Sequence, residues 1–219
     1  MGCAGVIVAS GSSRRMGFDK LAAPLAGKPV LRRSLEALLA VPEITRVIVV
    51  CGEERFDDLL RGDHPKPVLR VDGGAERQDS VYAGLSAVKA SEELVAVHDG
   101  ARPLVDPGDI SACIAAAREH GAASLGRTVT ETLKRTDADG LVLGGLDRSN
   151  LWFTETPQVF RTDLLLEAYR QVREQGLVVT DEVSAMEPMG IATRMIQSTR
   201  PNPKITVPAD LEAAHALLA

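Results

Sequence analysis

The sequence predicts an α/β fold with a mostly parallel central sheet and helices on both of its faces. Short runs of β-branched residues alternate along the chain with segments that carry apolar residues at helical spacing. Such alternation favours parallel strands joined by helical crossovers. The chain is 45% apolar but only 3% aromatic, so the core is expected to be aliphatic. Its 219 residues suit a single domain, 1–219, with one appendage.

Five segments are expected to form strands. The first, residues 5–9, reads GVIVA, and its continuous apolar character is typical of a strand buried on both faces. The others are residues 46–51, 68–71, 94–98 and a strand that opens at 122–125. In a parallel sheet ligands bind at the carboxyl ends of the strands. The segments that directly follow these strands are therefore the candidates for function.

Helices are expected between the strands. Asp106 and Pro107 read as an N-cap and first turn, and Thr162 is expected to cap a helix that ends near Gly176. The remaining helices are expected at 29–39, around 81–88 and from about 209 to the C-terminus. Residues 132–144 break the pattern, because Asp139-Gly140 between two short β runs predicts a hairpin. This hairpin is expected to reach out of the domain as an arm at about 132–148.

Net charge, cysteine spacing and the length of the apolar runs argue against several classes of protein. A net charge of −5 argues against a general nucleic-acid binder. Cys3, Cys51 and Cys113 have no metal-ligand spacing and are expected to be reduced core residues, which fits a reducing cytosol. No apolar run approaches the ~20 residues of a membrane span, and no signal peptide is expected. We therefore expect a cytoplasmic protein without nucleic-acid or membrane partners.

The loop after the first strand has the composition of a phosphate-binding loop. Residues 10–20 contain glycine and serine, whose backbone N–H groups can converge on an anion, and the cations Arg14, Arg15 and Lys20. The alternative is an ordinary strand–helix connection with solvated basic residues. A second glycine-containing loop, residues 72–80, leads into a helix and is either a nucleotide contact or a tight turn with an N-cap.

Residues 98–103 follow the fourth strand and carry an acidic side chain. A carboxylate at a strand end beside two phosphate-binding loops is a natural magnesium ligand, and that residue is Asp99. Arg102 is placed to hold a further phosphate, although an Asp–Arg ion pair in a capped turn is the structural alternative. His98 is expected to be structural, because no chemistry suggested here needs a titrating base.

Eight segments, in order along the chain, resemble the 2-C-methyl-D-erythritol 4-phosphate cytidylyltransferases of the non-mevalonate isoprenoid pathway. The resemblance extends from Gly5 to about Leu211. The segments are ASGSSRRMG with Lys20, DGGAERQDSV, VHDGARP, ETLKR, DRSNLW, TPQVF, TDEVSA and KITVPADL. This family resemblance implies a Rossmann-like, doubly wound sheet of the nucleotide-diphospho-sugar transferase type. It also implies a Mg²⁺-dependent transfer from CTP to methylerythritol phosphate, and a homodimer in which the hairpin arm contacts the other subunit.

The resemblance also implies roles for individual residues. Arg15 and Lys20 match the pair that stabilises the transition state at the α-phosphate, and Asp99 matches the magnesium site. The nucleotide-binding positions are Ala9, Ser10, Gly11, Ser12 and Ser13 around the triphosphate and Gly74 and Ser80 at the cytosine. The positions around the acceptor are Arg102, Thr132, Arg148, Thr156, Thr180 and Lys204. Because the attacking phosphate is already a nucleophile, positioning and charge stabilisation suffice and no general base is required.

Three alternatives remain open at this point. Ribitol 5-phosphate cytidylyltransferase shares the first loop and a motif similar to residues 98–103, but residues 147–152 and 76–80 look more like the methylerythritol enzyme. A sugar-phosphate nucleotidyltransferase that uses another base is a second alternative. The third is a catalytically silent nucleotide-binding regulator on the same fold. Nucleotide binding without pyrophosphate release would distinguish the regulator from the enzymes.

Overall fold

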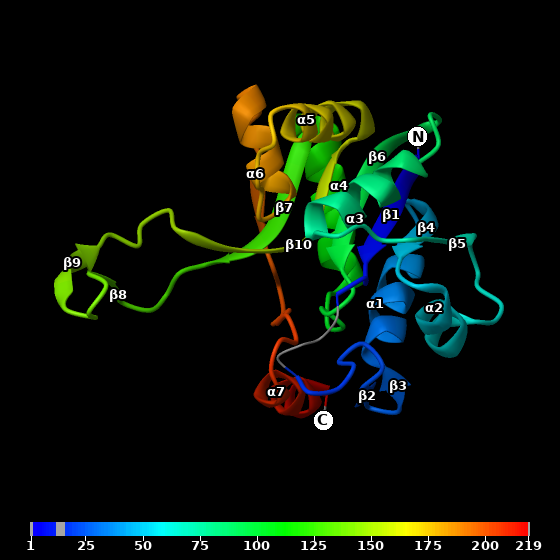
Figure 1. The fold of residues 1–219 in the computed structure, drawn as a ribbon, viewed down its shortest axis with the longest axis horizontal. Helices are drawn as coiled ribbons and strands as arrows, with labels where there is room; N and C mark the ends of the chain where they lie inside the picture. The colour runs from blue at the N-terminus through cyan, green and yellow to red at the C-terminus, as the bar shows by residue number, and fades with distance from the viewer. Residues whose placement is uncertain (1, 12–15, 219) are drawn as a thin grey trace.

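The structure, a computed structural model, describes residues 2–11 and 16–218 and is centred on a mixed sheet (Figure 1). In these ranges seven strands form the sheet, and strand β10 alone runs opposite to its neighbours. In spatial order they are β11 (Arg194–Gln197), β7 (Ala122–Thr128), β10 (Trp152–Arg161), β6 (Glu92–Asp99), β1 (Gly2–Val8), β4 (Ile44–Val50) and β5 (Val68–Val71). The predicted mostly parallel α/β architecture is confirmed.

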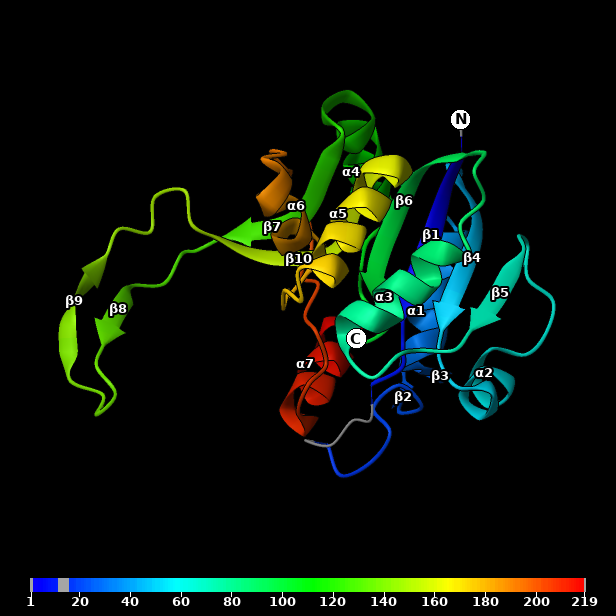
Figure 2. The same cartoon turned by 45° about the horizontal axis from the view of Figure 1, so that its top comes forward.

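Helices cover both faces of the sheet and enclose two aliphatic clusters. One face carries α1 (Val30–Leu39), α4 (Pro107–His120) and the edge helices α2 (Glu53–Leu60) and α7 (Pro208–Leu218). The other carries α3 (Arg77–Ser86), α5 (Thr162–Glu174) and α6 (Glu182–Met186), in front of the sheet in Figure 2. In β1, Val6 faces one cluster and Ile7 the other, which confirms a strand buried on both faces. Cys3, Cys51 and Cys113 are buried free thiols, as expected.

The smaller elements connect this framework. Strands β2 (Pro24–Leu25) and β3 (Lys28–Pro29) form a short hairpin before α1, and the 3₁₀ helix η1 (Glu187–Met189) follows α6. No helix in the described part of the chain is long and apolar enough to cross a bilayer.

The boundaries of most predicted elements agree with the structure, and one capping prediction is wrong. Asp106 caps α4 as expected, since its carboxylate accepts a hydrogen bond from the Gly108 N–H at 2.7 Å. Thr162 is the first residue of α5 rather than its cap. Arg161 occupies the cap position without a capping bond from its side chain, and the Thr162 hydroxyl donates to the Glu92 carbonyl at 2.8 Å. The hydroxyl therefore ties α5 to the start of β6.

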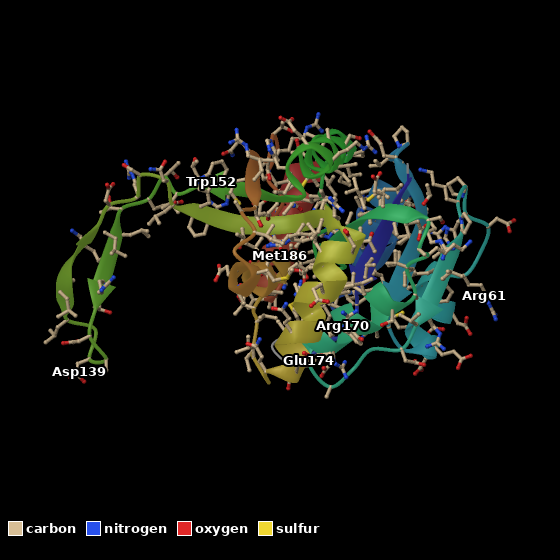
Figure 3. The ribbon with its side chains drawn as sticks, turned by 90° about the horizontal axis from the view of Figure 1, so that it is seen from above. Arg61, Asp139, Trp152, Arg170, Glu174 and Met186 are labelled. Atoms are coloured by element: carbon tan, nitrogen blue, oxygen red, sulfur yellow. The ribbon has the colours of Figure 1, made fainter. Side chains whose placement is uncertain are left out.

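A hairpin extends from the body, as residues 132–144 predict. Strands β8 (Leu133–Thr136) and β9 (Val142–Leu146) pair antiparallel, and Gly140 has the positive φ of 84° that its turn requires. Figure 3 shows Asp139 at the tip, far from the body, and Trp152 at the root. Leu141 and Leu143 on this arm are 67% and 64% exposed. Val142, between them, is 62% exposed, so the arm carries three consecutive exposed apolar residues.

Candidate functional site

A pocket of about 570 Å³ opens at the carboxyl ends of β1 and β6, where a parallel sheet is expected to bind ligands. Its walls come from four parts of the chain: the loop after β1, the loop that follows β5, the end of β6 and the segment before α7. The lining residues are Val8, Ala9, Ser10, Gly11, Lys20, Leu21, Gly74, Ala75, Glu76, Arg77, Asp99, Ala101, Lys204 and Thr206.

Asp99, the last residue of β6, is the centre of charge in this pocket. Its side chain is only 10% exposed and lies 2.8 Å from Lys204 Nζ, 3.2 Å from Arg77 Nη2 and 3.9 Å from Arg102 Nε. Burial by itself would raise the pKa of the carboxyl, but Arg77, Lys204 and Arg102 outweigh burial and hold the pKa well below its usual range. The ionised Asp99 thus has three cations within 4 Å. Arg77 is shared with the buried Glu182, and the remaining positive charge suits a phosphorylated ligand.

A chain of hydrogen bonds from Thr156 and His98, which lie outside the pocket lining, holds the backbone of Asp99. The Asp99 N–H donates to the Thr156 hydroxyl at 3.0 Å, and that hydroxyl lies 3.0 Å from His98 Nδ1. Burial lowers the pKa of His98 to about 4, so the ring is neutral. Its Nε2 lies 3.1 Å from the Arg102 carbonyl, which can only accept, so Nε2 carries the proton. His98 and Thr156 therefore position the Asp99 turn, and neither lines the pocket.

The loop after β5 is held tightly against both the first loop and α3. The Ser80 hydroxyl lies 2.8 Å from the Ser10 hydroxyl and accepts from the Gly74 N–H at 3.1 Å. A Cβ atom on Gly74 would lie 2.2 Å from Asp79 Cβ and 3.1 Å from the Asp79 carbonyl carbon. Only glycine therefore allows this approach of the loop to the helix.

Lys20 and Lys204 enter the pocket from opposite ends of the chain. Lys20 Nζ donates to the Ile205 carbonyl at 2.8 Å, and the Ile205 N–H donates to the Ala101 carbonyl at 2.9 Å. The Asn202 carbonyl accepts from Arg102 Nη1 at 2.7 Å, and the Asn202 amide donates to the Thr156 carbonyl at 2.9 Å. These bonds attach the segment before α7 to the Asp99 turn and bring both lysines to one cavity.

The structure does not bring all predicted residues to this pocket. Thr132 and Arg148 are exposed on the arm, where the Arg148 guanidinium donates to the Thr130 carbonyl. Thr180 is exposed beside α6, with its hydroxyl 3.1 Å from that of Ser184. Ser12, Ser13 and Arg15 lie outside the described residues.

Sequence reasoning did not assign a role to Arg77, which lines the pocket and connects Asp99 to Glu182. Its place within DGGAERQDSV, at the start of a helix after a glycine-containing loop, was the available signal. Glu182, at 0% side-chain exposure, was not identified either. No spacing rule relates two residues 105 positions apart.

A divalent cation fits this site only together with a phosphorylated ligand. In the described residues no group of three or more His, Cys, Asp or Glu side chains is arranged to hold a metal. Asp99 offers one carboxylate, already engaged by Lys204 and Arg77, and Glu76 is engaged in the capping box of α3. Mg²⁺ commonly takes one or two carboxylates and completes its shell with substrate phosphates and water. A metal that arrives with a nucleoside triphosphate is consistent with this donor set.

The glycine contact predicts a defect confined to nucleotide binding. Gly74→Ala must displace the loop from α3, so we expect the KM for the nucleotide, CTP in the reaction that the resemblance implies, to rise about tenfold or more. Gly52→Ala is the matched control, because a Cβ atom there meets nothing within 4 Å, its φ of −64° suits alanine, and it lies outside the pocket. Steady-state kinetics of both variants check this. An unchanged KM for CTP in Gly74→Ala would show that the loop does not bind the nucleotide.

Comparison with known proteins agrees with this geometry. The family model for 2-C-methyl-D-erythritol 4-phosphate cytidylyltransferase matches residues 3–219. The enzyme of that name from Pelotomaculum thermopropionicum is 41% identical, over 98% of this chain and 93% of its own length, and that from Parasynechococcus marenigrum is 42% identical, over 98% and 96%. A crystal structure of 4-diphosphocytidyl-2C-methyl-D-erythritol synthase from Anaerococcus prevotii superimposes with a TM-score of 0.87 at 28% identity, covering 99% of this chain and 96% of that one. With the match spanning nearly its entire length, the chain belongs to the 2-C-methyl-D-erythritol 4-phosphate cytidylyltransferase family.

Proposed function

We propose that this chain transfers the cytidylyl group of CTP to 2-C-methyl-D-erythritol 4-phosphate and releases pyrophosphate. The observation that carries the proposal is the pocket wall formed by Asp99, Arg77, Lys204 and Lys20, with Arg102 outside the lining but within 4 Å of Asp99. Such a concentration of cations suits two phosphorylated substrates that repel each other. Membership of the family and the names of its relatives support the same reaction.

The chemistry requires positioning and charge stabilisation. An oxygen of the acceptor phosphate attacks the α-phosphorus of CTP in line with the bond to the β-phosphate, which breaks as pyrophosphate departs. Because the attacking oxygen is already ionised, no proton needs to be removed. The described lining residues include no Cys or His, and the neutral His98 is committed to hydrogen bonds. This composition agrees with a reaction that needs neither a histidine base nor a thiol nucleophile.

We assign the two substrates to opposite sides of Asp99. We assign the loop after β1, with Ser12 and Ser13, and the pair Gly74 and Ser80 to nucleotide binding. Gly74 lines the pocket, whereas the buried Ser80 acts through its bonds to Ser10 and Gly74. Arg15 and Lys20 stabilise charge at the α-phosphate. Lys204, Arg102, Thr156 and Thr180 belong to the acceptor side, Thr156 by holding the backbone of Asp99. Mg²⁺, held by Asp99 and substrate phosphates, would neutralise part of the phosphate charge. We expect the reaction to take place in the cytoplasm.

Thr132 and Arg148 suggest that a second copy completes the acceptor side. Both lie on the arm, outside the pocket of their own chain, and the arm exposes Leu141, Val142 and Leu143. We infer a homodimer in which the arm packs on the partner and delivers these two residues to its pocket.

The dimer is tested by charging the arm. Leu143→Asp places a carboxylate in the apolar surface and is expected to shift the protein from dimer to monomer. Analytical ultracentrifugation at several concentrations measures this shift. Leu217→Asp, on the exposed part of α7, is the matched control and should remain dimeric. A wild-type protein that sediments as a monomer would exclude the arm-mediated dimer.

The reaction itself is tested by measuring pyrophosphate release with CTP and magnesium. Methylerythritol phosphate and ribitol 5-phosphate are offered in separate assays. Release with the first acceptor alone is the expected result. Release with ribitol 5-phosphate alone would mean that the acceptor side is wrongly assigned while the nucleotide side stands. CTP binding without release in either assay would favour a silent regulator.

Lys20 is expected to act mainly on the chemical step. Lys20→Met removes a cation placed for the transition state, and loss of one such preorganised group costs about 10²–10³ in kcat. The same order is expected for Arg15→Ala. Lys28→Met is the control, because Lys28 is exposed and pairs with Glu36 away from the pocket. A Lys20→Met enzyme that retains most of its kcat would remove the role assigned to this residue.

A further inference from the structure

Residues 177–183, the segment between α5 and α6 together with the start of α6, carry Thr180. The side chain of Gln78 binds this segment to α3. Gln78 Nε2 donates to the Leu177 carbonyl at 3.2 Å, and Gln78 Oε1 accepts from the Val179 N–H at 3.1 Å. One amide thus binds the backbone on both sides of Val178, in the manner of a neighbouring strand. Val178 itself is 89% exposed, so apolar burial of this side chain does not hold the segment in place.

Arg77, the neighbour of Gln78, joins the end of the same segment to the pocket. Its Nη1 and Nη2 donate to the two Glu182 carboxylate oxygens at 2.7 and 3.2 Å, and Nη2 also donates to Asp99 Oδ1 at 3.2 Å. The Tyr169 hydroxyl donates to Glu182 Oε1 at 3.1 Å, which further satisfies this buried carboxylate. The segment is therefore fixed to the same carboxylate that organises the pocket.

Gln158 of β10 holds the segment from the other side. Its Oε1 accepts from the N–H groups of Glu182 and Val183 at 3.0 and 3.1 Å, and its Nε2 donates to Asp181 Oδ2 at 2.9 Å. Residues 181–183 are thus anchored to the sheet. Residues 177–179 precede them. The Leu177 N–H donates to the Val172 carbonyl at 2.9 Å, and Leu177 and Val179 pack against the core cluster beside α3 and α5, so Gln78 adds to these contacts by holding the backbone on both sides of Val178. Thr180 lies between the two anchors.

We propose that Gln78 is a positioning residue for the acceptor, because it holds residues 177–180 in the conformation that presents Thr180. The inference rests on the proposed function, in which Thr180 belongs to the acceptor side. Gln78 is not among the residues that line the pocket. When the amide is removed, the Val179 N–H loses its acceptor while Leu177 stays bonded to Val172. Residues 178–180 then populate other conformations, and the acceptor binds only the remaining competent fraction. CTP binding should be unaffected, since the loop at 73–76 keeps its contacts with Ser10 and Ser80.

The test compares Gln78→Met, which preserves length and removes both hydrogen bonds, with Gln175→Met on the exposed end of α5. We expect Gln78→Met to raise the KM for methylerythritol phosphate about 3- to 10-fold and to leave the KM for CTP within about twofold. Gln78→Glu keeps an acceptor for the Val179 N–H but has no donor for the Leu177 carbonyl, so its KM for the acceptor should also rise. Gln175→Met should match the wild type in both constants.

Hydrogen exchange gives a readout that does not depend on turnover. The Val179 amide should exchange faster in Gln78→Met than in Gln175→Met, while amides of β6 exchange at equal rates. Faster exchange with an unchanged KM for the acceptor would reduce Gln78 to a structural role. A parallel rise of both KM values would show damage to the nucleotide loop, and either result overturns the proposal. If the wild type used only ribitol 5-phosphate, the proposed function would fail, and the same comparison with that acceptor would still decide the role of Gln78.

Discussion

The buried carboxylate of Asp99 holds the cations of the pocket close together before any ligand binds. Asp99 draws together Arg77 from the start of α3, Arg102 from the turn after β6 and Lys204 from the segment before α7. Without an anion these cations would repel one another at short range. Asp99 offsets that repulsion, and the Thr156–His98 chain fixes the turn on which it stands. The site is therefore assembled in advance, and little reorganisation is needed when phosphates arrive.

The same arrangement determines how a metal can take part. A carboxylate already engaged by Lys204 and Arg77 is a poor cation site by itself, because a divalent ion there would face two positive charges. Phosphate groups change that balance, since they compete for the cations and supply oxygens of their own. Metal binding and nucleotide binding are thus expected to be coupled. In the proposed reaction, Asp99 would be the counter-ion of the pocket before the substrates bind and a metal ligand only in the loaded site.

Short sequence patterns predicted the elements that depend on neighbouring residues, namely a strand, a helix cap and a turn. The GVIVA run predicted β1, Asp106 before Pro107 predicted the α4 cap, and Asp139-Gly140 predicted the turn of the arm. Strand β10 was missed because its middle is polar and contains Pro157, where the pairing with β7 is irregular. The pairing of Arg77 with Glu182 was missed for another reason. Only the fold brings these two residues together, and nothing in their separation of 105 positions indicates it.

The same difference between local and long-range contacts distinguishes the two sides that we assign to the site, one for the nucleotide and one for the acceptor. The nucleotide side is built from loops next to central strands, and its tight glycine contact at Gly74 leaves little freedom for change. The side that we assign to the acceptor is attached by polar side chains, namely Gln78, Gln158 and the amide of Asn202. Specificity for the acceptor can therefore change while the nucleotide side is retained. We accordingly expect the residues that discriminate between sugar phosphates to lie outside the first loop, namely at the start of α3, on the arm and in the later part of the chain.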